Sequence, residues 1–134
     1  MNYFIDTNII IYALKNSYPN IVKRFETTPS YNIFIPSIVK AEIDYGASKS
    51  KNSKQTRDLY NKFLSIYTIV PFTEKETKTY GDIRYQLEKV GKLIGANDML
   101  IAAIVLSHDG ILVTHNIDEF SRIKGLQIED WTEK

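Results

Sequence analysis

Three acidic residues, Asp6, Glu42 and Asp98, have the types and positions in this sequence that could support chemistry. Asp6 closes an apolar and aromatic stretch and precedes a polar Thr-Asn pair, so its side chain is expected to point out of the core where the backbone turns. Asp98 opens a run that is apolar all round over residues 99–106, which is typical of a buried helix. Carboxylates in such places favour a functional site.

Each acid also has an ordinary structural explanation. Asp6 has the residue type preferred as a helix cap. Most helical glutamates face solvent or pair with lysine, and an Asp in the first turn of a helix is favoured by the helix dipole. Glu42, however, shares a mainly apolar face with Ile38, Ala41 and Tyr45, where burying a charge is costly without compensation. No single acid decides between the two interpretations.

The elements that must position these acids alternate between strand and helix. We expect strands at residues 2–5, 31–35, 67–71, 111–114 and, at an edge, 127–129. We expect helices at residues 9–14, 19–27, from 38 past 45, 52–67, 73–92 and 96–107, with a helical turn at 118–123. This order predicts a three-layer α/β/α fold around a mostly parallel sheet of about five strands.

The parallel sheet predicts where the polar residues meet. Ligands of such sheets bind beyond the carboxyl ends of the strands, where the strand order changes direction. Asp6 closes the first strand, Ser37 follows the second, and Thr114 and Asn116 follow the strand that begins at Ile111. These polar side chains are therefore expected at one edge of the sheet.

A cluster of acids without matching bases would repel itself strongly unless a cation were bound. Oxygen ligands suit Mg²⁺ or Mn²⁺. Mg²⁺ keeps several waters and uses few carboxylates, which leaves positions for a phosphate oxygen and an attacking water. That arrangement predicts metal-assisted hydrolysis of a phosphodiester.

Length and composition predict a single domain over residues 1–134. The chain can bury one core, and its 43% hydrophobic and 25% charged residues are ordinary for a globular protein. The absence of cysteine excludes disulfides and thiolate sites. The N-terminus has no basic lead or cleavage site, and no apolar run approaches about 20 residues, so we expect a cytoplasmic protein without a membrane span.

The densest basic stretch follows the Glu42 helix and contains Lys49, Lys51, Lys54 and Arg57. A charge run is usually a solvated surface, and the net charge of +1 is weak support for a nucleic-acid partner. Its position beside the expected pocket nevertheless predicts contact with RNA phosphates. Of the two histidines, His108 is expected to cap a helix, whereas His115 lies beside the site.

The ordered set of motifs resembles the PIN-domain ribonucleases of the VapC toxin type, found in type II toxin–antitoxin systems. The resemblance covers nearly the whole chain, although each motif alone is weak. The matching segments are FIDTN (4–8), SIVKAE (37–42) with YGA (45–47), IGAND (94–98) with IAA (101–103), LVTHN (112–116) with EF (119–120), GL (125–126) and EDW (129–131).

This resemblance implies an endoribonuclease that needs Mg²⁺ or Mn²⁺, acts on a structured RNA such as transfer RNA, is inhibited by a cognate VapB-like antitoxin and forms a homodimer. It assigns the metal to Asp6, Glu42 and Asp98. The supporting positions that it implies are Thr7, Asn8, Ser37 and Thr114.

The chain departs from the family at Asn116, where many members carry an Asp. An amide brings no charge, so we expect a second metal site to be weaker or absent in this chain. The resemblance places Asn116 among the catalytic residues, and Glu119 in the same loop is the candidate to compensate.

Two other functions remain open from the sequence. A phosphatase that uses Asp6 as its nucleophile would carry a second Asp two residues later, where this chain has Asn8. A non-catalytic RNA-binding or receiver-like module would use the acids only for structure, and a receiver would carry an acidic pair before its phosphorylated Asp. Loss of RNA cleavage in an Asp6→Asn variant or in excess chelator distinguishes the nuclease from both.

Overall fold

The structure is a computed structural model that describes residues 1–133. Its strands are β1 (Tyr3–Ile5), β2 (Ile33–Pro36), β3 (Thr68–Val70), β4 (Ile111–Val113) and β5 (Gln127–Glu129). Its α-helices are α1 (Thr7–Leu14), α2 (Pro19–Thr27), α3 (Ser37–Ser48), α4 (Ser53–Leu64), α5 (Glu74–Lys89), α6 (Ala96–Ser107) and α7 (Ile117–Phe120).

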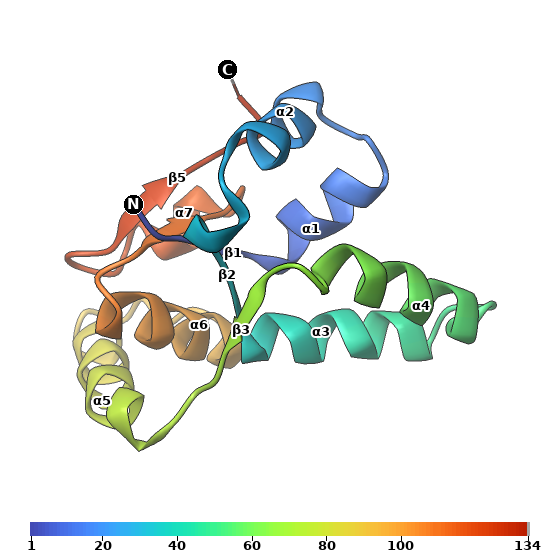
Figure 1. Cartoon of the computed structure of the whole chain (residues 1–134). Coiled ribbons are helices and arrows are strands. Elements are labelled where there is room, and N and C mark those ends of the chain that lie inside the picture. Colours follow the sequence, from blue (N-terminus) through green and yellow to red (C-terminus); the bar gives the residue numbers. More distant parts are fainter. Residues whose placement is uncertain (134) are drawn as a thin grey trace.

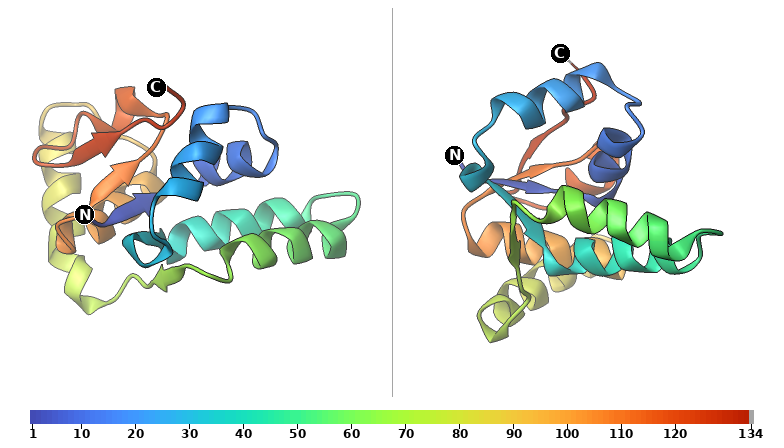
Figure 2. Two further views of the ribbon diagram at one scale, coloured as in Figure 1. Left: turned by 45° about the horizontal axis from the view of Figure 1, so that its top comes forward. Right: turned by 45° about the vertical axis from the view of Figure 1, so that its right-hand side comes forward.

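The five strands form one parallel sheet in the order β3-β2-β1-β4-β5. Helices α1 and α2 lie on one side of this sheet, whereas α3, α5 and α6 lie on the other (Figures 1 and 2). The three-layer α/β/α prediction is confirmed, and the sheet proves to be parallel throughout. The strand order changes direction between β1 and β4, so the chemistry is expected at their carboxyl ends.

Several expected elements are shorter in the structure. A 3-10 turn, Ser30–Asn32, occupies the expected start of β2. Helix α4 ends at Leu64, and the backbone N–H of Ser65 bonds to the carbonyl of Lys62. Helix α5 begins with the expected Thr73–Glu76 capping box and ends at Lys89, shortly before Gly91. Gly91 has a φ of 67°, a conformation that favours glycine and ends helices.

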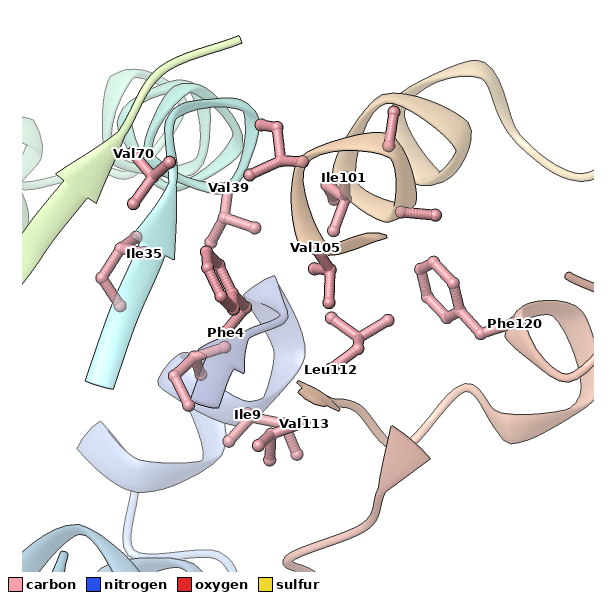
Figure 3. Packing of buried hydrophobic residues seen from close by; sticks show 14 of the residues in the cluster. Phe4, Ile9, Ile35, Val39, Val70, Ile101, Val105, Leu112, Val113 and Phe120 are labelled. Carbon is pink, nitrogen blue, oxygen red and sulfur yellow. The ribbon is translucent and has the colours of Figure 1, made fainter. Parts of the chain in front are cut away.

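The core lies on both faces of the sheet and is built around Phe4 and helix α6 (Figure 3). Helix α6 is buried along most of its length, as its apolar sequence predicts. A Cβ atom on Gly110 would lie 2.3 Å from the Phe4 ring, so only glycine allows β4 to begin so close to β1. No helix among the described residues is long and apolar enough to cross a membrane.

The buried face of α3 differs from the prediction. Val39, Ile43 and Ala47 face the core, whereas Tyr45 is exposed. Both stripes repeat at helical spacing, and packing against the sheet selects the first. Leu59 of α4 has the helical spacing of a core residue relative to the partly buried Phe63, yet it is 53% exposed.

Candidate active site

Asp6 follows β1 and is held at both carboxylate oxygens. Its Oδ1 accepts a 2.9 Å hydrogen bond from the Thr7 amide, and its Oδ2 accepts a 2.7 Å bond from the Thr114 hydroxyl. Its own amide bonds to the carbonyl of Val113 on β4. The Asp6 side chain is therefore fixed at the β1–β4 junction, where the topology predicts a ligand site.

Glu42 reaches this junction from α3. The Thr7 hydroxyl donates a 2.6 Å hydrogen bond to Glu42 Oε1, across 35 positions of sequence. Thr7 thus contacts Asp6 through its amide and Glu42 through its side chain. The family resemblance implied that Thr7 supports the site but did not predict this bond, because the bond depends on how α1 packs against α3.

Asp98 lies in the first turn of α6, and its pKa is raised to about 7. Burial is the largest cause, followed by the negative charges of Asp6 and Glu119, a hydrogen bond to Glu119 and the charge of Glu42. Burial also raises the pKa of Asp6, and it outweighs the hydrogen bonds from Thr114 and Thr7 that lower it. The two aspartates thus lie within the same electrostatic cluster as Glu42 and Glu119.

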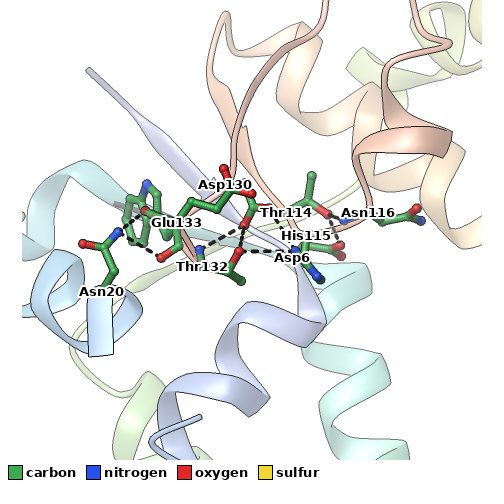
Figure 4. A network of polar contacts seen from close by, with 9 residues as sticks. Asp6, Asn20, Thr114, His115, Asn116, Asp130, Thr132 and Glu133 are labelled. Atoms are coloured by element: carbon green, nitrogen blue, oxygen red, sulfur yellow. Dashed lines mark hydrogen bonds and ion pairs between the residues drawn. The ribbon is translucent and has the colours of Figure 1, made fainter. Parts of the chain in front are cut away.

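Glu119 of α7 is the fourth acid of this cluster. The Asn116 side-chain amide donates a hydrogen bond to Glu119 Oε2, and the Asn116 backbone amide donates to the Thr114 hydroxyl at 3.0 Å. Figure 4 shows Thr114 between Asp6 and Asn116. At the position where many family members carry an Asp, Asn116 therefore orients the carboxylate of Glu119.

None of the four carboxylates forms an ion pair with a lysine, arginine or histidine of the described residues. None of the ion pairs found within residues 1–133 includes Asp6, Glu42, Asp98 or Glu119. In the same part of the chain, no three acidic or imidazole groups stand together at direct metal-binding spacing. The negative charge of the cluster is thus concentrated and not neutralised by lysine or arginine.

Two of the predicted supporting residues do not contact these acids directly. Ser37 Oγ accepts a 3.2 Å hydrogen bond from the Phe72 amide, which fastens the start of α3 to the segment after β3. Asn8 is exposed, and its side chain has no hydrogen-bond partner among the described residues. Ser37 therefore positions the Glu42 helix rather than the Glu42 carboxylate.

The basic stretch divides into residues near the acids and residues away from them. Arg57 pairs with Asp44 at 3.3 Å and bonds to the Ser48 hydroxyl at 2.7 Å, so it holds α4 against α3. Lys51 and Lys54 lie at the tip of the α3–α4 hairpin, which projects from the sheet in Figure 2. Lys49 alone of the four lines a hollow that also contains Glu42.

The two histidines have different settings. His108 Nδ1 lies 2.8 Å from the carbonyl of Ile104, so it caps α6 as expected. His115 Nδ1 lies 2.9 Å from Asp130 Oδ2, and its ring approaches those of Tyr12 and Tyr18. His115 is therefore held beside the site and belongs to the polar network drawn in Figure 4.

Two hollows meet at Glu42. One, of about 420 Å³, is lined by residues 95–98 together with Glu42, and the other, of about 470 Å³, extends from Glu42 to Tyr45 and Lys49. Asn97 lines both hollows. Asn97 was not among the residues predicted for the site, although its position directly before Asp98 was a signal.

Comparison with known proteins gives a consistent result. The PIN domain family model matches residues 3–126. Ribonuclease VapC2 of Rickettsia felis is 42% identical over 132 residues, which cover 98% of each chain. The tRNA(fMet)-specific endonuclease VapC of Salmonella typhimurium is 33% identical over 131 residues, again covering 98% of each chain.

Solved structures agree with these similarities. The crystal structure of VapBC2 from Rickettsia felis bound to a DNA fragment from its promoter matches with a TM-score of 0.91 and 41% identity, over 98% of this chain and 99% of that one. DNA-bound VapBC from Salmonella typhimurium matches with a TM-score of 0.92 and 33% identity, over 98% of both chains.

Proposed function

The chain belongs to the PIN-domain family and its VapC ribonucleases, and we propose that it is a divalent-metal-dependent endoribonuclease that cleaves transfer RNA as the toxin of a toxin–antitoxin pair. The observation that carries the metal dependence is the cluster of four carboxylates without a cationic partner among the described residues. Carboxylates gathered in a partly buried site are costly unless a cation compensates them.

The residues present fit Mg²⁺ or Mn²⁺ in their chemistry. All four acidic side chains offer hard oxygen donors, and no thiolate is available in a chain without cysteine. Mg²⁺ usually keeps several waters and takes only one or two carboxylates directly. Within residues 1–133, no three of these acids stand at the spacing of direct metal ligands. We therefore propose that some of them contact the ion through water. Asp6 and Asp98 would hold it, with Glu42 and Glu119 completing the shell.

The chain's own groups prepare the site for this chemistry. Thr7 and Thr114 fix the Asp6 carboxylate, and Thr7 also fixes Glu42. Without a cation, burial and the neighbouring negative charges raise the pKa of Asp98 to about 7, so its carboxyl keeps a proton up to near neutral pH. A bound divalent ion would supply charge neutralisation for the scissile phosphate and an acidified water as attacking group.

The same geometry argues against a phosphatase with Asp6 as its nucleophile. Such a nucleophile needs an exposed carboxylate oxygen. Asp6 is 6% exposed, and each of its oxygens already accepts a hydrogen bond. These bonds suit a carboxylate that is held in place rather than one that attacks a phosphate.

Names of relatives support transfer RNA as the substrate. Two relatives, from Shigella flexneri and Salmonella typhimurium, are named tRNA(fMet)-specific endonucleases, at 31% and 33% identity over 98% of this chain. We propose a structured RNA of this class as the target in the cytoplasm.

The titles of similar structures support an antitoxin partner, because they describe VapBC complexes. An apolar hollow of about 510 Å³ between α1, α2 and α4 suits such a partner, and its rim carries the exposed side chains of Leu59 and Ile66. Exposed apolar patches of this kind are typical of protein interfaces. Homodimer formation stays a prediction, which sedimentation analysis of the purified protein tests.

The decisive experiment incubates purified protein with total RNA in Mg²⁺ or Mn²⁺ and sequences the new RNA ends. We expect cleavage at defined positions in transfer RNA, loss of cleavage in excess chelator, and loss in an Asp6→Asn variant that keeps the wild-type circular dichroism spectrum. Undiminished cleavage by the variant or in chelator contradicts the proposed metal-dependent site.

A further inference from the structure

We propose that Tyr45, Lys49 and Asn97 form a nucleotide-binding subsite beside the acidic cluster, where an unpaired base of the RNA stacks on Tyr45 and the adjoining phosphate contacts Lys49. The inference rests on the proposed function, because it names the part of the RNA that this face of the site would hold. It also assigns the RNA contact of the basic stretch to Lys49 and not to the other three basic residues.

The subsite is continuous with the acidic cluster. Its hollow of about 470 Å³ shares Glu42 and Asn97 with the smaller hollow over Asp98. A hollow of this size lies within the range of small-ligand sites. A strand of RNA whose phosphate lies at the acids would therefore place a neighbouring nucleotide beside Tyr45.

Tyr45 provides an aromatic surface that the fold does not use. Its side chain is 66% exposed, although α3 buries the residues at 39, 43 and 47 of the same helix. Lys49 Nζ lies 4.8 Å from the centre of the Tyr45 ring, which keeps the two side chains together. Stacking of unpaired bases on exposed aromatic rings is a general mode of single-strand binding, and it tolerates many base sequences.

Lys49 provides a free positive charge at this point. Lys40 and Arg57 both pair with Asp44, so each of them already has a carboxylate partner. Lys49 has no carboxylate partner within residues 1–133, and its Nζ lies over the Tyr45 ring. A lysine in this setting is suited to a phosphate.

The remaining lining completes a nucleotide-like set of contacts. Ile11 and Ala41 offer apolar walls, and the Asn97 amide offers a donor and an acceptor for a base edge. Gly46 leaves one wall open, since a Cβ atom there would meet nothing within 4 Å. This set of groups matches one nucleotide. The aromatic ring, the amide and the apolar walls suit a base, and the cation suits a phosphate.

The first test measures RNA affinity in an Asp6→Asn background, which is expected to leave the RNA intact. Fluorescently labelled oligouridylate and total transfer RNA are the probes. We expect Tyr45→Ala to weaken binding roughly tenfold and Tyr45→Trp to retain it. Tyr85→Ala is the matched control, because Tyr85 is 67% exposed on the distant helix α5. Lys49→Gln should weaken binding and reduce its salt dependence by about one phosphate contact.

A second test fills the hollow instead of removing its wall. Gly46→Leu should weaken RNA binding by about the same factor as Tyr45→Ala, whereas Gly81→Leu should not. Gly81 is a matched control because it is also a helical glycine with nothing within 4 Å of its Cβ position. Circular dichroism and a melting curve establish that both variants fold.

The outcomes separate this inference from the proposed function. Wild-type RNA affinity in Tyr45→Ala and Gly46→Leu overturns the subsite, even when the parent enzyme cleaves RNA. Weakened binding in these variants supports it, even when the wild-type protein does not cleave RNA and the proposed function fails. Unchanged RNA affinity with lost binding of a co-expressed antitoxin assigns the hollow to the protein partner and also overturns the proposal.

Discussion

Thr114 donates a 2.7 Å hydrogen bond to Asp6 from a position 108 residues later in the chain. The bond is possible because Ile5 and Val113 are register partners on adjacent parallel strands, so the next residue of each strand enters the same junction. Thr114 is fully buried and also accepts a hydrogen bond from the Asn116 amide. One hydroxyl therefore links Asp6 to the loop that carries Glu119.

Replacing Thr114 by valine should impair the site while keeping its volume. Asp6 loses a hydrogen bond that lowers its pKa, and the Asn116 amide loses its acceptor. A hydrogen bond to a charged group contributes about 1.5–3 kcal/mol, so we expect at least a tenfold loss of cleavage rate and a raised metal requirement. Rates across a Mn²⁺ titration measure both effects. Thr114→Ser, which keeps the hydroxyl, should stay near wild type, and equal losses in the two variants contradict this role.

Glu119→Gln should weaken metal binding, because it removes one negative charge from the cluster that surrounds Asp98. Asn116→Ala should act in the same direction by releasing the Glu119 carboxylate that it holds. Loss of a residue that orients a metal ligand typically costs about 10–100-fold in affinity or activity. Calorimetric titration with Mn²⁺ gives the affinities.

The neighbouring acid Asp118 supplies the control for this pair. It is largely exposed, and its Oδ2 lies 3.3 Å from Arg122, away from the cluster. Asp118→Asn should leave Mn²⁺ affinity unchanged. An equal loss in Asp118→Asn would show that the effect of Glu119→Gln arises from general charge and not from the site.

The sequence predicted those parts of the fold that local patterns determine. Each strand-to-helix junction, the Thr73–Glu76 capping box and the buried helix α6 are visible in residue types at fixed spacing. The convergence of Asp6 with Thr114 followed from the parallel sheet alone. Local pattern and topology were sufficient for these features.

The sequence did not predict features that depend on packing between distant segments. The stripe that contains Tyr45 and the stripe that contains Ile43 both repeat at helical spacing, and only contact with the sheet decides which is buried. The Thr7–Glu42 bond and the pairing of Arg57 with Asp44 likewise need the relative placement of helices.

Trp131 is a core residue that was not predicted from the sequence, and its loss should destabilise the protein. Its side chain is fully buried, its indole N–H donates to Glu129 at 3.0 Å, and the Arg24 guanidinium lies 4.6 Å from the ring centre. Removing a buried tryptophan typically costs about 3–5 kcal/mol. Urea unfolding of Trp131→Ala should show a loss in this range, and Trp131→Phe a smaller one. A change below about 1 kcal/mol for the alanine variant contradicts a core role.

The stability of the chelated protein should fall as the pH rises from about 4 to about 7. Burial and the charges of Asp6, Glu119 and Glu42 raise the pKa of Asp98 from 3.8 to about 7, so the folded protein binds more protons than the unfolded chain within this window. Burial raises the pKa of Asp6 in the same direction, whereas the lowered pKa of Asp130 affects stability only below the window.

Urea midpoints measured in excess chelator from pH 4.5 to 8 should therefore decline and level off above about 7. Asp98→Asn should flatten the decline, and saturating Mg²⁺ should restore stability above neutral pH by binding the ionised folded form. A chelated wild-type protein that gains stability through this window, or an Asp98→Asn variant with an unchanged slope, contradicts the assigned coupling.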